Sequence, residues 1–174
     1  MSEMLHFVSD FLNAGGDVLL VIFIASILLW SLILERFLFM KKTYPDLREK
    51  VLNEWNIRKD HKSWSAQRIR EAQLSIMRMA LTRNISKIKV LVALCPLLGL
   101  LGTVTGMISV FDVMALTGTG NARLMASGIS MATIPTMAGM VAALSGLYFG
   151  SYFETKSKNL FNMLSDELTF EEDM

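Results

Sequence analysis

The sequence predicts an all-α integral membrane protein in which three transmembrane helices are extended by long cytoplasmic helices. Three runs without a charged residue carry this prediction: Val18–Leu34 with 17 residues, Val90–Phe111 with 22 and Leu124–Phe153 with 30. A hydrocarbon core of about 30 Å needs about 20 helical residues. The second and third runs reach this length, and Phe37–Met40 continues the first past Glu35 and Arg36. Buried helices of a soluble protein are the alternative, but such helices rarely continue this far without a charge.

The charges that flank these runs predict the orientation of the chain. Between Lys41 and Lys89 there are 13 Lys and Arg against 5 Asp and Glu, whereas before Val18 there are no basic residues and 3 acidic ones. Short loops rich in Lys and Arg remain in the cytoplasm. We therefore expect the N-terminus outside and the C-terminus inside. Because no basic residue precedes Arg36, we do not expect a cleavable signal peptide.

The first two elements follow from apolar spacing. Residues 1–16 place Met4, Phe7, Phe11 and other apolar side chains on one helical face, which predicts a short interfacial helix on the outer side. Two glycines end this segment and form a natural hinge. Transmembrane helix 1 is predicted over 17–40.

A cytoplasmic helical region is predicted over 41–89. Pro45 suits the first turn of a helix that begins after Thr43, and a polar stretch at 56–65 separates this helix from the next. Apolar residues then recur at steps of three and four residues, which predicts a second helix. Its basic residues face lipid headgroups, a partner or water, and the sequence leaves these alternatives open.

This second helix is expected to continue into the membrane. Neither Gly nor Pro occurs between Ser65 and Cys95, so we predict one unbroken helix over 65–111. Transmembrane helix 2 is its part at 90–111. At the standard rise, such a helix is about 70 Å long.

The last elements are a turn, a span and a tail. Residues 112–123 include the sequence ALTGTGN, which is typical of a turn on the outer side. Transmembrane helix 3 is predicted over 124–153 and a cytoplasmic tail over 154–174. Because the connection is so short, the last two spans must be antiparallel neighbours.

Small residues recur along these two spans. Gly99, Gly102 and Gly106 follow one another at steps of three and four residues, and Gly139 and Gly146 lie in the last span. Lipid gives no hydrophobic force between helices, so close van der Waals contact through small residues holds them together. We assign these five glycines to helix packing in a crowded bundle.

Three threonines lie near the middle of the same runs: Thr103, Thr133 and Thr136. A membrane threonine often only bonds a carbonyl of its own helix, which is one interpretation. Pro96 and Pro135 favour another, because each removes a backbone hydrogen bond and favours a helix kink. The freed carbonyls need a hydroxyl or ordered water. This combination favours a hydrated or partner-filled interior.

No Asp, Glu, Lys, Arg or His lies deep in any run. Proton and ion pathways normally contain such a group, and a threonine does not change its protonation state. Three helices also cannot surround a lumen. If the hydroxyl face is functional, several copies must form a ring, and another chain must supply the titratable group.

The sequence does not predict an enzyme, a metal site or a cofactor. The single cysteine, Cys95, lies within a membrane run, and the histidines, His6 and His61, lie outside the runs. No nucleophile therefore has a base nearby. One cysteine also excludes an intrachain disulfide and a cysteine metal cluster.

Two blocks, PLLGLLGTVTGM at 96–107 and GISMATIPTMAGMVAAL at 128–144, resemble the MotA/TolQ/ExbB proton-channel family, and ExbB most closely. The layout of the spans agrees with this resemblance. It implies a pentameric ring in the bacterial inner membrane, with a periplasmic N-terminus and a cytoplasmic C-terminus. Thr103 and Thr136 fall on the family's pore-lining threonines, and we group Thr133 with them.

The resemblance also implies partners and a function. A single-span ExbD-like chain in the pore would supply the aspartate that carries protons, and a TonB-like protein would receive the energy. Protons are then the coupling ion, membrane lipids surround the ring, and no nucleic acid is expected. The implied function is to energise outer-membrane transport of iron chelates and vitamin B12.

The sequence departs from the family pattern at two positions. Met131 stands where many relatives carry a glutamate, which leaves more of the proton transfer to the partner, and Pro135 stands where relatives often have a small residue. The chain is also compact, as in the variant ExbB chains of accessory TonB systems. Two alternatives remain. One is a TolQ-like subunit that supports envelope integrity, and the other is a non-conducting scaffold that recruits a partner through basic residues such as Arg68 and Arg70.

Overall fold

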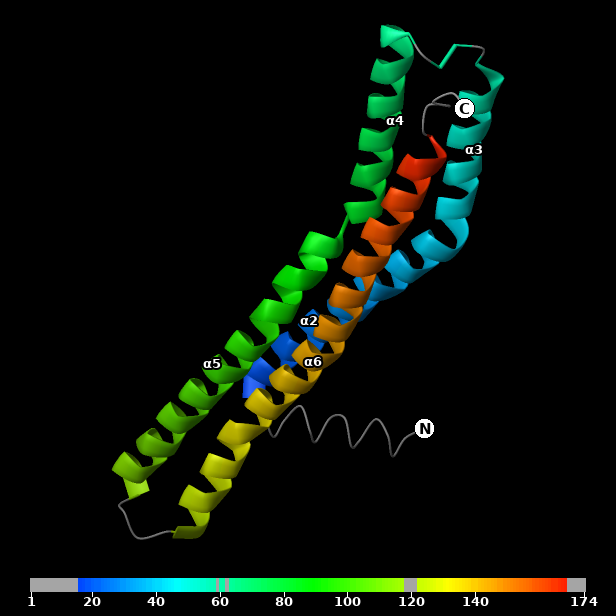
Figure 1. Cartoon of the computed structure of the whole chain (residues 1–174). Coiled ribbons are helices and arrows are strands. Elements are labelled where there is room, and N and C mark those ends of the chain that lie inside the picture. The colour runs from blue at the N-terminus through cyan, green and yellow to red at the C-terminus, as the bar shows by residue number, and fades with distance from the viewer. Residues whose placement is uncertain (1–15, 59, 62, 118–121, 169–174) are drawn as a thin grey trace. The chain divides into compact units, whose positions relative to one another are not determined.

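The computed structural model describes residues 16–58, 60–61, 63–117 and 122–168, and every element within them is helical. Figure 1 shows the elements in order: α2 (Gly16–Leu38), the π-helical turn η1 (Phe39–Thr43), α3 (Tyr44–Ile57), α4 (Trp64–Thr82), α5 (Ile85–Thr117) and α6 (Ala122–Glu167). Three helical stretches are long and apolar enough to cross a membrane: 16–57, 64–116 and 128–167. The chain is therefore an all-α, multi-pass membrane protein. The predicted interfacial helix lies outside the described residues, apart from Gly16.

The chain divides into two compact units. The described part of the first unit contains residues 16–31, 88–117 and 122–148, and that of the second contains 32–58, 60–61, 63–87 and 149–168. Helices α2, α5 and α6 each contribute residues to both units. The first unit holds most of the three apolar runs, and the second holds most of the basic segment.

Two sets of contacts fix how the spans run in the first unit. A Cβ atom added to Gly102 of α5 would lie against Pro135 of α6 and 3.3 Å from Val18 Cγ1 of α2. One added to Gly146 of α6 would lie 2.5 Å from Val92 Cγ2 of α5 and 2.7 Å from Leu29 Cδ2 of α2. From the contacts around Gly102 to those around Gly146, residue numbers increase along α2 and α6 and decrease along α5. The last two spans are therefore antiparallel neighbours, as predicted.

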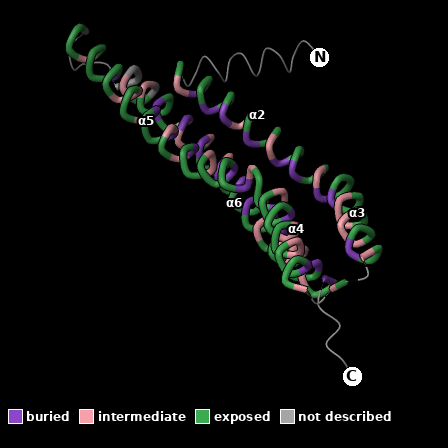
Figure 2. The backbone as a smooth tube through the Cα atoms, turned by 90° about the horizontal axis from the view of Figure 1, so that it is seen from above, coloured by how far each residue is buried: buried purple, intermediate pink, exposed green. Residues whose placement is uncertain are grey.

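A hydrophobic core holds the second unit together. It joins α3, α4 and the end of α6, whose ribbons lie side by side in Figure 1, and buried positions recur along all three helices in Figure 2. Its buried members are Tyr44, Trp55, Ala66, Met77, Leu81, Leu164 and Leu168. This apolar contact makes the polar segment a small helical bundle instead of a set of isolated helices.

Basic side chains also link the helices of this bundle. Arg48 of α3 forms a two-pronged ion pair with Glu167 of α6, including a bond of 3.0 Å from Nε. Arg70 of α4 donates to the carbonyl oxygens of Ser165 and Leu168, where α6 ends. A cation at a helix C-terminus satisfies carbonyls that have no partner in the helix. Part of the basic character of the 41–89 segment is therefore structural.

Helix α3 begins at Tyr44 with Pro45 in its first turn, as predicted, but it follows α2 and η1 without a break. The Thr43 side chain makes no capping bond, and its backbone is helical. The turn before the proline widens into the π-helix η1, in which the Tyr44 N–H bonds the Phe39 carbonyl. A wider turn accommodates a residue that has no N–H and would clash with the carbonyl four residues earlier.

The prediction of one unbroken helix over 65–111 is wrong. Helix α4 ends at Thr82 and α5 begins at Ile85. Arg83 takes an extended ψ of 138° and Asn84 a left-handed φ of 62°. The physical reason is a pair of contacts from α2, Arg36 to Ala80 and Asn84 to Glu35. Local helix propensity could not reveal contacts between residues more than forty positions apart.

Tyr44→Phe is expected to destabilise the second unit by about 1–2 kcal/mol. The Tyr44 hydroxyl donates to the Leu160 carbonyl at 2.9 Å, and the ring is buried in the core. Burial also raises the pKa of Tyr44. The stabilisation from this hydroxyl is therefore fully present below about pH 10 and is lost as the hydroxyl ionises at higher pH. Thermal unfolding in detergent checks this, with the exposed Tyr152→Phe as the control. Equal midpoints for both variants would contradict the expectation.

Candidate functional site

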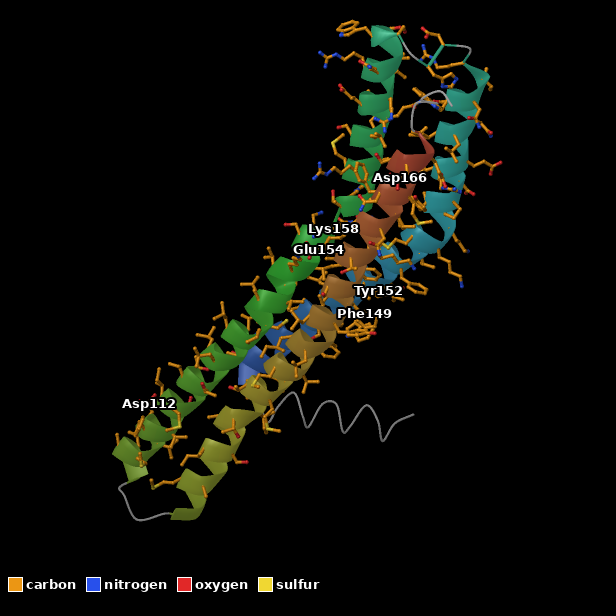
Figure 3. All side chains as sticks on the ribbon, viewed as in Figure 1. Asp112, Phe149, Tyr152, Glu154, Lys158 and Asp166 are labelled. Carbon is orange, nitrogen blue, oxygen red and sulfur yellow. The ribbon has the colours of Figure 1, made fainter. Side chains whose placement is uncertain are left out.

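The candidate site lies on α5 and α6 within the first unit, along stretches that carry no charge. Figure 3 labels the acidic residues that end these stretches, Asp112 on α5 and Glu154 on α6. Over the residues that the structure describes, no group of His, Cys, Asp and Glu could hold a metal ion. The polar groups available in these stretches are hydroxyls and backbone carbonyls.

Glycines bring the backbones of α5 and α6 into direct contact. A Cβ added to Gly99 would lie 2.9 Å from Thr136 Cα, and one added to Gly106 would lie 2.8 Å from Ala132 Cα. One added to Gly139 would lie 2.5 Å from the Cys95 carbonyl oxygen. Real side chains do not tolerate such distances, so the helix spacing depends on these glycines. The contacts place the neighbouring threonines at defined positions along this seam.

Thr136 links the two helices. Its hydroxyl donates to the Gly99 carbonyl oxygen on α5 at 2.9 Å, and its side chain is half-buried. Pro96 frees the Val92 carbonyl, so the Gly99 carbonyl that Thr136 binds is not the one left without its helical bond. Thr136 thus holds α6 to α5 one residue after Pro135, and its lone pairs remain acceptors.

Thr103 and Thr133 bond within their own helices. The Thr103 hydroxyl donates to the Leu100 carbonyl at 2.7 Å, and the Thr133 hydroxyl donates to the Ser130 carbonyl at 2.8 Å. Thr103 is half-buried and Thr133 is exposed in the chain. In this state each hydroxyl oxygen accepts from an outside donor, such as water or a protonated carboxylic acid. To donate to a carboxylate, each must first rotate away from its carbonyl.

The two prolines have different surroundings. Pro135 is fully buried and fills the space that the missing side chain of Gly102 leaves on α5. Pro96 is half-buried. Both α5 and α6 remain helical through these positions. At Pro135, therefore, the ring is a packing element between the helices as well as an interruption of the backbone bonds.

A second set of hydroxyls was not singled out from the sequence. Thr105 donates to the carbonyls of Leu101 and Gly102, and Ser109 donates to the Thr105 carbonyl. Both are exposed. Their spacing of four residues is the only signal in the sequence that places them together on one face. They offer acceptors on a face of α5 other than the one that carries Thr103.

The site as a whole can bind water or a partner carboxyl group, but it cannot change its own charge. Met131 is 45% exposed on α6 and does not titrate. A proton that passes along this seam therefore needs a carrier from outside the two helices.

Comparison with known proteins agrees with these features. The profile described as the MotA/TolQ/ExbB proton channel family matches residues 40–166. The chain is 48% identical over 63 residues to the biopolymer transport protein named ExbB-like 1 from Synechocystis sp., covering 34% of this chain and 25% of that protein. It is 34% identical over 79 residues to ExbB-like 3 from the same organism, covering 44% of this chain and 38% of that protein. The matched regions thus span well under half the length of these relatives.

Proposed function

Because the chain belongs to the MotA/TolQ/ExbB proton channel family, we propose that it is the ring-forming subunit of an ExbB-type motor. The ring, of five copies, lies in a bacterial inner membrane with the N-terminus in the periplasm and the C-terminus in the cytoplasm. A single-span ExbD-like chain occupies the pore and supplies a membrane aspartate. A TonB-like protein receives the energy and opens outer-membrane transporters for iron chelates and vitamin B12.

The observation that carries this proposal is the arrangement of hydroxyls along the uncharged stretches of α5 and α6. The Thr103 and Thr133 hydroxyls donate to carbonyls of their own helices and keep their lone pairs available. A neutral aspartic acid would donate to such an oxygen, whereas an ionised aspartate would need the hydroxyl to rotate and donate. The two protonation states of the partner would therefore make different contacts with the same residue.

A difference in contacts between two protonation states is what couples proton flow to movement. One charge that crosses a potential of 100 mV releases about 2.3 kcal/mol. A ligand or proton shifts a two-state equilibrium only by its differential affinity for the two states. This energy is enough to bias the position of the partner by roughly fiftyfold per proton.

The names of the two relatives favour the ExbB role over the TolQ-like alternative. The scaffold alternative loses part of its support, because Arg70 is engaged with the end of α6. Arg68 remains on the surface, where it pairs with Glu71.

Native mass spectrometry of the protein in lipid discs tests the proposal. The protein is measured alone and after co-expression with an ExbD-like single-span chain. We expect a closed ring that takes up a small number of copies of a span containing an aspartate. A monomer or dimer that binds no such chain would remove the pore, and with it the proposed function.

A further inference from the structure

Nothing in the local sequence requires the interruption between α4 and α5. The two residues at the interruption, Arg83 and Asn84, are neither glycine nor proline. The left-handed φ of 62° at Asn84 is unfavourable for an L-residue, although asparagine tolerates it better than most. Contacts from elsewhere in the second unit must compensate for this backbone.

Two consecutive residues at the end of α2 bind both sides of the interruption. Arg36 donates from Nη1 to the Ala80 carbonyl oxygen at 3.0 Å, in the last turn of α4. Asn84 donates from Nδ2 to Glu35 Oε2 at 2.8 Å. Each bond involves a charged group, which strengthens it most at the buried Arg36, whereas the bond to Glu35 is exposed to solvent. We call these two bonds the α2 clamp.

The clamp leaves part of Arg36 unsatisfied. This side chain is fully buried, and its Nε and Nη2 have no hydrogen-bond partner among the described residues. Its guanidinium carbon lies 4.7 Å from the centroid of the Phe39 ring, which offsets part of the burial. Buried donors without a partner are destabilising. The engaged clamp therefore combines two strong bonds with unpaired donors and an unfavourable φ.

Two conformations are both populated when the free-energy contributions that favour each of them are of similar size. We propose that the α4–α5 junction is a two-state joint that the α2 clamp controls. While Glu35 and Arg36 form these bonds, the helix is interrupted at Arg83 and Asn84. When they are released, these two residues become helical and α4 continues directly into α5.

The released state is the one that the local sequence favours, since the stretch from Ser65 to Cys95 contains no helix breaker. A change at the end of α2 is thereby transmitted to the helix that contributes Ala66, Met77 and Leu81 to the core of the second unit. This joint is a property of the isolated chain and does not depend on the proposed proton-driven function.

Two substitutions at one position test the joint. Asn84→Ala and Asn84→Gly both remove the bond to Glu35, but only alanine penalises the left-handed φ. Spin labels are attached at two exposed positions through Gln67→Cys and Lys87→Cys in a Cys95→Ala background. In a straight helix these positions are about 30 Å apart, and the non-helical backbone at Arg83 and Asn84 gives a different distance.

Pulsed electron paramagnetic resonance then measures the distance distribution. We expect the population near 30 Å to rise about tenfold in Asn84→Ala relative to Asn84→Gly. Identical distributions for the two variants and the parent would mean that the kink is static, and the proposal would be overturned. Alanine at this half-buried position adds no bulk, so both variants should fold.

The clamp itself is tested by hydrogen exchange of the backbone amides at 83–87. Glu35→Ala and Arg36→Gln are expected to slow this exchange roughly tenfold, because the amides enter a continuous helix. Arg68→Gln is the control, since its guanidinium pairs with Glu71 and lies over the Trp64 ring, both on the surface of α4. Unchanged or faster exchange in the clamp variants would contradict the proposal. Neither readout requires proton transfer, so the proposed function is judged separately.

Discussion

Replacing Thr103 with valine is expected to remove most of the proposed proton-driven activity while the protein remains folded and assembled. Valine keeps the branched shape of the half-buried side chain but has no lone pairs. Within the chain, the variant loses only a bond to the Leu100 carbonyl of its own helix. A hydrogen bond to a charged group contributes about 1.5–3 kcal/mol. The rate of energy transfer should therefore fall by roughly 10- to 150-fold.

Thr105→Val is the matched control for this prediction. Thr105 lies on the same helix and also bonds its own backbone, at Leu101 and Gly102. Two residues along a helix correspond to about 200°, so it occupies a different face from Thr103. Uptake of an iron chelate is measured in cells that contain only the variant, together with the amount of assembled complex. Normal uptake with Thr103→Val would remove this residue from the proton path.

Thr136 is a less informative choice for such a test. Its hydroxyl bonds the Gly99 carbonyl of the neighbouring helix, so Thr136→Val changes helix packing as well as the acceptor. The sequence could identify this threonine through the family resemblance. It could not indicate that the hydroxyl joins α6 to α5, because that contact depends on the rotation of both helices.

The three spans could be predicted from the sequence because their signal is additive. Each uncharged run sums many small transfer free energies, and a single exception such as Arg36 does not cancel the total. The antiparallel order of α5 and α6 follows from a short connection. These features depend on composition and chain length, which are both visible without a structure.

The interruption at Asn84 could not be predicted for the opposite reason. It depends on two individual bonds, from Arg36 to Ala80 and from Asn84 to Glu35. Tertiary contacts of this kind override helix propensity, which is a weak preference at each residue. The roles of Arg48 and Arg70 were missed in the same way. A count of basic residues predicts orientation, but it does not separate surface charges from those that bind the end of α6.

The second large effect is expected at Gly139, where α5 and α6 are in direct backbone contact. Gly139→Ala should lower the free energy of unfolding by about 2–3 kcal/mol. A Cβ there would lie 2.5 Å from the Cys95 carbonyl oxygen and 3.3 Å from Gly99 Cα. Both are backbone atoms of α5, so the overlap can be relieved only by moving the helix. Any such movement also weakens the neighbouring contact at Thr136.

Gly146→Ala, two turns along the same helix, is the matched comparison. Its Cβ would meet methyl carbons, Val92 Cγ2 at 2.5 Å and Leu29 Cδ2 at 2.7 Å. Side-chain ends can shift by a few tenths of an ångström, so we expect a loss below about 1 kcal/mol. Alanine raises helix propensity by about 1 kcal/mol in both variants, and this contribution cancels in the comparison.

Reversible unfolding in mixed detergent micelles, followed by circular dichroism, measures the difference between the two variants. A larger loss for Gly139→Ala means that direct backbone contact fixes the distance between α5 and α6 at the level of Cys95. The position of the threonines along the seam would then be set by rigid helices and not by adaptable side chains. Equal losses would mean that α5 and α6 adjust their spacing, and the defined geometry assigned to Thr103 and Thr136 would no longer follow from the glycines.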